Sequence, residues 1–349
     1  MESAEALEDL LERVRALVTS GELAGIANPT LALFERTLAV RGAAQHAVAT
    51  VSGTMALELA LEAAGVGRGH EVIVPALSAY GTLAAVLRRR ATPVIVDVHP
   101  KRLTLDPLAI RHGLSEHTRA VIAVHAMGIA PDVGSIRSAV GPSVFVLEDM
   151  AQGFPGTVRG DAAALSLSAR KPIDLGEGGA VLTNDVDLAL ALRWLTCLGH
   201  AGVSLDGGKV EWNRGHVVVG TSARMPALQA ALGLYRLETL RETLQQQKTR
   251  LIALRRAAPQ AGLEPLVEPV VPLAACFEGP LAPGLAEHLP LLRPASVYQA
   301  HKEPPIARKA RLTDTPVADR LERTLVVLAT DVEDPQALER TVKALVTFA

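Results

Sequence analysis

The sequence predicts an α/β fold in which a large, mainly parallel sheet domain is followed by a small α+β domain. Between residues 46 and 185, short apolar runs alternate with helical stretches. Runs that are apolar throughout are typical of strands buried on both faces, as in a parallel sheet covered by helices. The last hundred or so residues are instead rich in proline and glycine, and 349 residues leave room for one large and one small domain.

Each element follows from local pattern. Leucine and charge recur at helical spacing near the N-terminus, which predicts a first helix there and a second one at 28–42. Seven strands are predicted at 46–52, 71–76, 92–98, 118–125, 143–149, 162–168 and 179–185. Helices are predicted at 53–65, 80–90, 106–114, 132–140, 185–198, 224–258 and 334–348. We divide the chain into a large domain at 1–240 and a small one at 241–349.

Composition excludes several kinds of partner. The formal net charge is -2, so nothing calls for nucleic acid or an acidic membrane surface, both of which need a concentrated basic face. The only cysteines, Cys197 and Cys276, have no metal-ligand spacing and form no disulfide framework. The acidic N-terminus does not resemble a signal peptide, and no apolar stretch is long enough to cross a bilayer. We therefore expect a cytoplasmic protein without a metal.

Polar residues follow several predicted strands, at the sheet edge where ligands bind in such folds. The Ser52-Gly53-Thr54 turn enters a helix, so it either binds a phosphate or merely caps the helix. Asp149 ends a strand beside Glu148, where a carboxylate either holds a ligand or forms a structural ion pair. Gln152 follows within one turn and can add a hydrogen bond to the same ligand.

Ser166 and Lys171 complete this group. A lone lysine is usually a solvated surface charge. A phosphate turn, an aspartate, a serine and a lysine are, however, the parts that hold pyridoxal 5'-phosphate (PLP). The lysine forms an imine with the aldehyde and needs a lowered pKa, and the aspartate keeps the pyridine nitrogen protonated. For His125, also at a strand end, we expect a structural or cofactor-adjacent role.

Linked motifs between about residues 28 and 240 resemble the DegT/DnrJ/StrS family of PLP-dependent sugar aminotransferases. They are "VSGTMALELALEAAGVGRGHEVIVPALSAYGTLAAVLRRRATPVIVDVHP", "AVIAVHAMGIAPDVGSI", "VLEDMAQGFPG", "LSLSARKPIDLGEGGAVLTND" and "GTSARMPALQAALGLYRLETL". Any one of these would be weak, but their order along the chain makes the resemblance specific. The resemblance implies PLP-dependent transferase fold type I.

The resemblance also implies roles for individual residues. Lys171 would be the Schiff-base lysine and proton shuttle, Asp149 would pair with the pyridine nitrogen, and Gln152 would approach the phenolic oxygen of the ring. The cofactor phosphate would be bound by Gly53, Thr54 and Ser166. Ser222 stands where the family usually has an asparagine that reaches the partner subunit's cofactor, which implies a homodimer with shared active sites.

Three departures from the family pattern bear on the substrate. Ala79 takes the place of the aromatic residue that usually stacks on the cofactor, so either Tyr80 takes over or the ring is covered differently. The segment before Ser166 is shortened. The C-terminal domain is short, and we find no match there to the family's usual histidine pattern. Arg170 either lowers the pKa of Lys171 or contacts the phosphate, or it points into solvent or to an acidic partner.

From the resemblance we predict an aminotransferase that moves an amino group from glutamate or glutamine to a keto-sugar or cyclitol ketone. Two alternatives stay open. One is a PLP enzyme of the same fold that acts on a small non-nucleotide substrate in natural-product biosynthesis. The other is a PLP-binding regulator or non-catalytic partner subunit, against which Lys171 and Asp149 weigh.

Overall fold

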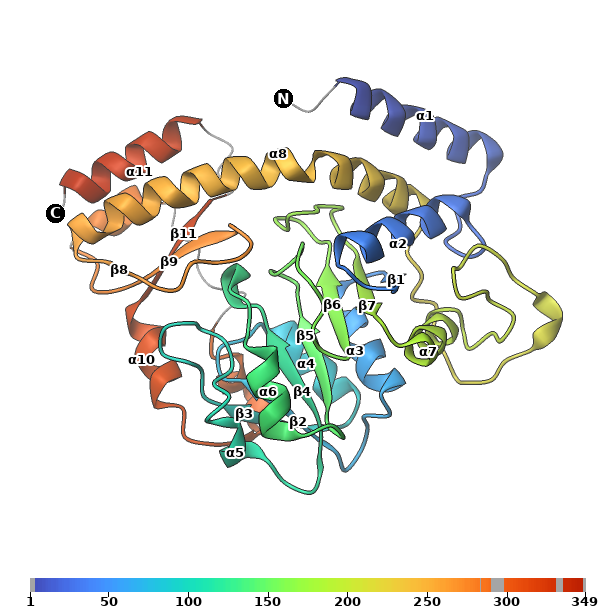
Figure 1. Cartoon of the computed structure of the whole chain (residues 1–349), viewed down its shortest axis with the longest axis horizontal. Helices are drawn as coiled ribbons and strands as arrows, with labels where there is room; N and C mark the ends of the chain where they lie inside the picture. Colours follow the sequence, from blue (N-terminus) through green and yellow to red (C-terminus); the bar gives the residue numbers. More distant parts are fainter. Residues whose placement is uncertain (1–3, 283, 290–297, 331–334, 348–349) are drawn as a thin grey trace.

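The computed structural model describes residues 4–282, 284–289, 298–330 and 335–347. Its centre is an eight-stranded sheet within these residues (Figure 1). The strands lie in the order β1 (His46–Thr50), β7 (Gly179–Thr183), β6 (Ala162–Ser166), β5 (Phe145–Asp149), β4 (Thr118–Val124), β2 (Glu71–Pro75), β3 (Thr92–Val96) and β10 (Arg311–Leu312). Only β7 runs antiparallel to its neighbours, so the predicted mainly parallel sheet is confirmed.

Side chains alternate between two buried faces of this sheet. In β4, Ala120 and Ile122 enter one core cluster, while Val121 and Ala123 enter another on the opposite face. The first face is covered by α3 (Gly53–Ala63), α4 (Tyr80–Arg88) and α7 (Val186–Thr196). The second is covered by α5 (Ile110–Gly113) and α6 (Val133–Val140) beside β2 to β5, and by α2 (Pro29–Arg41) and α8 (Ala227–Ala257) beside β1, β6 and β7. Burial on both faces explains why the strands read as continuous apolar runs.

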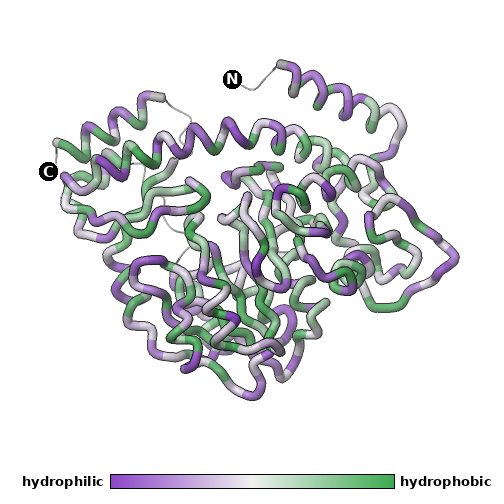
Figure 2. Tube along the Cα trace, in the orientation of Figure 1, coloured by the Kyte–Doolittle hydropathy of each residue, from purple (hydrophilic) through white to green (hydrophobic). Residues whose placement is uncertain are grey.

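The long helix α8 links the two parts of the chain. Figure 1 shows it running across the whole molecule, with α1 (Ala4–Ser20) along one half and α11 (Pro335–Thr347) along the other. Along its length the tube in Figure 2 alternates between hydrophilic and hydrophobic colours, as expected for a helix with one buried side. Gly233 permits close contact with α2, because a Cβ there would lie 2.3 Å from the Phe34 ring.

The C-terminal part forms a three-stranded sheet within the described residues. Its order is β11 (Leu325–Ala329), β9 (Ala274–Glu278) and β8 (Glu264–Pro265), all antiparallel, and it packs with α8 and α11. Between β9 and β11, α9 (Pro304–Ala307) and α10 (Pro316–Thr324) flank β10. Since β10 pairs in parallel with β3, this segment returns to the large sheet and adds an eighth strand to the seven that were predicted.

Most predicted elements form at the expected places, and the helix predicted at 106–114 is the main difference. Only Ile110–Gly113 is helical there. Oδ1 of Asp106 accepts a hydrogen bond from the N–H of Leu108, an Asx turn that competes with helix formation. No helix in the described part of the chain has the length and apolar character needed to cross a membrane.

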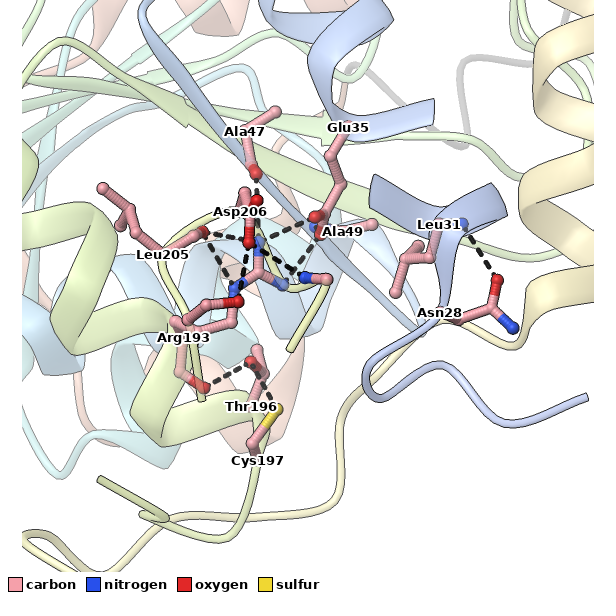
Figure 3. A network of polar contacts seen from close by, with 12 residues as sticks. Asn28, Leu31, Glu35, Ala47, Ala49, Arg193, Thr196, Cys197, Leu205 and Asp206 are labelled. Carbon is pink, nitrogen blue, oxygen red and sulfur yellow. Dashed lines mark hydrogen bonds and ion pairs between the residues drawn. The ribbon is translucent and has the colours of Figure 1, made fainter. Parts of the chain in front are cut away.

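A buried ion pair joins α2 to α7. The guanidinium of Arg193 donates two hydrogen bonds to the carboxylate of Glu35, at 2.9 and 2.7 Å, and both side chains are at most 4% exposed. Figure 3 shows that the network also includes the carbonyl of Leu205 and the N–H of Ala49. One pair of charges therefore fixes a helix, the first strand and the loop after α7.

Candidate active site

The predicted site residues come together at the carboxyl ends of the strands. A cavity of about 260 Å³ lies there, and its walls include Gly53, Thr54, Asp149, Ser166 and Lys171. These five residues come from four places: the start of α3 after β1, the end of β5, the end of β6 and the loop after β6. Parallel strands that end at one edge of a sheet bring such residues together.

The glycine turn forms one end of this cavity. Ser52 caps α3, since its Oγ accepts a hydrogen bond from the N–H of Met55 at 3.2 Å, so the capping interpretation is confirmed for that residue. Gly53 and Thr54 line the cavity at the helix N-terminus, where free N–H groups and the helix dipole favour an anion. A Cβ on Gly53 would lie 2.7 Å from the Cβ of Ser166. The turn therefore approaches β6 as closely as only glycine allows.

Asp149 is held in a fixed orientation. It is 5% exposed, and its Oδ2 accepts a 2.8 Å hydrogen bond from Oγ1 of Thr82, while Oδ1 accepts one of 3.1 Å from the N–H of Ala151. Thr82 lines the same cavity and was not singled out in the sequence. It lies one turn into α4, where a small polar residue on a buried helix face was the available signal.

Lys171 faces the same cavity, and its charge is disfavoured. Burial lowers the pKa of Lys171, although the nearby carboxylate of Asp149 acts in the opposite direction. Arg170 has no part in this pKa shift, and its backbone N–H donates to Asp174 at 3.2 Å. Within the described residues the Lys171 amine forms no hydrogen bond or ion pair. It is thus an amine with space around it and a bias toward the neutral, nucleophilic form.

Ser166 has a partner on the same turn. Its Oγ lies 3.0 Å from Oγ of Ser168, which also lines the cavity. Two hydroxyl groups therefore stand opposite the glycine turn, and hydroxyls can donate to a phosphate from this side.

Three predicted residues do not line this cavity. Tyr80 begins α4 and is 41% exposed. Gln152 is buried, and its Oε1 accepts a 2.7 Å hydrogen bond from the N–H of Met127. Ser222 is exposed in the single chain, where its backbone bridges to Cys197. Ala79 does line the cavity, and none of the residues that line it is aromatic.

His125 contacts the carboxylate next to Asp149. Its Nε2 lies 2.8 Å from Oε2 of Glu148, and both side chains are buried. Burial alone would raise the pKa of Glu148, but hydrogen bonds from His125 and from the N–H groups of Gly160 and Arg159 hold that pKa below its usual value. The two neighbouring carboxylates therefore have different surroundings: Glu148 contacts His125 and the backbone, while Asp149 faces the cavity.

The residues present fit pyridoxal 5'-phosphate. A glycine turn that a single Cβ would fill suits a phosphate, a fixed carboxylate suits a pyridine nitrogen, and an unpaired amine suits an aldehyde. Among the described residues, no group of three or more His, Cys, Asp or Glu side chains is placed to hold a metal ion.

Comparison with known proteins agrees with this geometry. GDP-perosamine synthase from Caulobacter vibrioides is 37% identical over 219 residues, which cover 60% of this chain and 57% of that protein. L-glutamine:2-deoxy-scyllo-inosose aminotransferase from Streptomyces lividus is 35% identical over 240 residues, covering 66% of this chain and 56% of that protein. The chain thus matches little more than half the length of these relatives.

Solved structures match over nearly the whole chain. DesV from S. venezuelae is 27% identical with a TM-score of 0.82, covering 99% of this chain and 95% of that one. NtdA from Bacillus subtilis, solved with bound cofactor PMP, is 22% identical with a TM-score of 0.85, covering 99% of this chain and 82% of that one. The fold is therefore PLP-dependent transferase fold type I, as expected.

The family model for the DegT/DnrJ/EryC1/StrS aminotransferases matches residues 5–268, three quarters of the chain. Members of this family are PLP-dependent transferases, and the cavity described above fits that cofactor. Fold, site and sequence thus agree that this chain belongs to the DegT/DnrJ/EryC1/StrS aminotransferase family.

Proposed function

We propose that this protein is an aminotransferase that moves an amino group from glutamate or glutamine to the ketone of a keto-sugar or cyclitol. The observation that carries the proposal is that Lys171 and Asp149 face one cavity beside the Gly53 turn. When bound, PLP supplies an aldehyde for the amine and a ring that accepts electrons from the substrate carbon.

The chain's own residues divide the remaining tasks. Asp149, held by Thr82, keeps a proton on the pyridine nitrogen. Gly53, Thr54 and Ser166 bind the phosphate and so fix the position of the ring. Lys171 would hold the cofactor and would carry a proton between the substrate carbon and the cofactor, which its lowered pKa favours. We assign Gln152 to the phenolic oxygen of the ring and Tyr80 to a neighbouring position.

The proposed acceptor follows from the relatives' names. One relative acts on a GDP-linked sugar and the other on 2-deoxy-scyllo-inosose, a cyclitol with no nucleotide. Ala79 stands where the family usually has an aromatic residue, so no aromatic side chain would cover that face of the cofactor ring. Nucleotide-linked sugars and nucleotide-free cyclitols should therefore both be tested as acceptors. A small non-nucleotide substrate is therefore the second candidate.

We also propose a homodimer whose active sites are shared. Apolar side chains of the loop after α7 are exposed in the single chain, among them Leu198 at 52%, Trp212 at 68% and Val219 at 93%. Such a group of exposed apolar residues is typical of an interface. Ser222 lies at the end of this loop and would reach the partner's cofactor phosphate.

We further propose a cytoplasmic location, which the two cysteines support because both are buried and free, as in a reducing compartment. The domain division near residue 240 falls within α8, so we propose that the first half of this helix belongs to the large domain and the second half to the small one.

A spectroscopic experiment tests the proposed function. Purified protein reconstituted with PLP should show the visible band of the lysine-bound cofactor, and glutamate or glutamine should convert the spectrum to that of the amine form. Lys171→Ala should lose the band, whereas exposed Lys248→Ala should keep it. A protein that binds PLP but responds to no amino donor would be a regulator or partner subunit, and the proposal would be wrong.

A further inference from the structure

A second cavity shares Lys171 with the one described above. It measures about 420 Å³ and lies between the loop after β6 and the middle of α8, which this loop reaches in Figure 1. Lys171 lines both cavities, so the second one is next to the proposed reaction site. Its size is in the range typical of small-molecule sites, about 300–1,000 Å³.

The α8 wall of this cavity is polar along one helical face. Its residues recur every three or four positions, which places them in one row on a helix. They are Arg236, Thr239, Thr243, Gln246, Gln247 and Arg250. Two of them, Thr239 and Gln247, are buried, and a buried polar group is costly unless a partner satisfies it.

Gln247 is the residue of this row that most needs a partner. It is 6% exposed, and its Oε1 is buried without a hydrogen-bond donor among the described residues. A buried carbonyl left without a donor costs about 1–3 kcal/mol. The cavity therefore offers an acceptor to an N–H or O–H group of a ligand.

The charge of this cavity is positive. Its walls hold the side chains of Arg170, Arg236 and Arg250 against one carboxylate, Asp174. That carboxylate already accepts hydrogen bonds from the backbone N–H groups of Arg170 and Gly176. Arg250 donates to the carbonyl of Thr330, and neither it nor Arg170 has an ion pair within the described residues.

We propose that this second cavity binds the carboxylate of the amino donor, with Arg170 and Arg250 as its cationic ligands and Gln247 as acceptor for a donor N–H. Guanidinium groups bind carboxylates with two parallel hydrogen bonds. The choice of carboxylate follows from proximity. In an amino acid the α-carboxylate is on the carbon that carries the transferred nitrogen, so it must lie beside Lys171. The phosphate of an activated sugar is several bonds from the ketone.

This inference rests on the proposed function, because it names where one of the two substrates binds. Its test is binding of glutarate, a dicarboxylate without an amine, to the PLP-loaded protein by calorimetry. Arg170→Gln and Arg250→Gln are compared with Arg241→Gln, an exposed residue of α8 outside the cavity. We expect each arginine variant to weaken glutarate binding about tenfold, as for loss of one charged hydrogen bond, and Arg241→Gln to leave it unchanged.

A second experiment distinguishes a site for the amino donor from a site for the phosphate of an activated sugar. The donor half-reaction with glutamine or glutamate, followed by the cofactor spectrum, should lose apparent affinity in Arg170→Gln, while the half-reaction of the amine form with a keto acceptor should not. Unchanged glutarate binding in both arginine variants would overturn the proposal. So would arginine-dependent binding of inorganic phosphate in place of glutarate, which would assign the cavity to an activated sugar.

The two proposals fail in different ways. If no donor changes the spectrum of the unmodified protein, the aminotransferase proposal fails, whatever glutarate does. If the unmodified protein reacts with donors and the arginine variants react equally well, only the location of the carboxylate is wrong.

Discussion

Thr82 Oγ1 donates a 2.8 Å hydrogen bond to Oδ2 of Asp149, a residue 67 positions further along the chain. The bond ties the first turn of α4 to the end of β5 and is buried. A carboxylate that must face a pyridine nitrogen is better placed when a neighbouring group restrains it. The Thr82 hydroxyl is such a group, because it fixes the orientation of the Asp149 carboxylate.

Thr82→Val should therefore weaken PLP binding. Loss of one hydrogen bond to a charged group corresponds to about 1.5–3 kcal/mol, or at least tenfold in the dissociation constant. Titration of cofactor-free protein followed by absorbance measures the constant. Thr82→Ser keeps the hydroxyl and should bind as the unmodified protein does. Normal binding by Thr82→Val would contradict the role of the hydrogen bond, and so would an equal loss in Thr82→Ser, which keeps the hydroxyl and lacks only the methyl group.

Gly53→Ala should also impair cofactor binding, by a steric route. The added Cβ would lie 2.7 Å from the Cβ of Ser166, so either the turn or β6 must shift. Overpacking of this kind costs about 1–3 kcal/mol, and the phosphate site would lose at least about tenfold in affinity. The control is Gly67→Ala, where the nearest atom to a new Cβ is 3.9 Å away. Unimpaired PLP binding by Gly53→Ala would place the phosphate elsewhere.

Lys171→Met should stabilise the cofactor-free protein near neutral pH. Burial lowers the pKa of Lys171, so the unfolded chain binds a proton there more readily than the folded one. This cost to stability is fully present below the folded pKa and disappears as pH rises to the ordinary lysine value of about 10.4. Urea unfolding at several pH values measures it, and the gain from the substitution should shrink as pH rises. Exposed Lys248→Met should show no such trend, and a pH-independent gain would mean that packing, not charge, is responsible.

Glu35→Ala should be strongly destabilising. It would leave Arg193 buried without its partner carboxylate and the N–H of Ala49 without its acceptor, as Figure 3 illustrates. Breaking a buried pair in this way costs about 3–5 kcal/mol of unfolding free energy. The partly exposed pair of Asp9 and Arg13 gives the comparison, because Asp9→Ala should cost no more than about 1 kcal/mol. Similar losses in the two variants, measured by urea unfolding, would contradict the burial argument.

The sequence predicted the strands well because each is buried on both faces and reads as an apolar run. The residues at the strand ends could also be predicted, because a turn, a carboxylate or a lysine that follows a predicted strand can be recognised from its position. Helix 106–114 was overpredicted because the Asx turn at Asp106 depends on a local hydrogen bond that the apolar pattern does not contain. β10 is only two residues long, and nothing local indicates that it joins β3.

What the sequence by itself determined is the alternation of strands and helices, the family, and the residues placed at the strand ends. These depend on residue type and local spacing. Only the tertiary structure decided that Thr82 restrains Asp149, that Glu148 is taken up by His125, and that α8 turns a row of polar residues toward Lys171. Each of these depends on which segments meet across the sheet edge. Such contacts join residues far apart in the chain, and no local pattern records them.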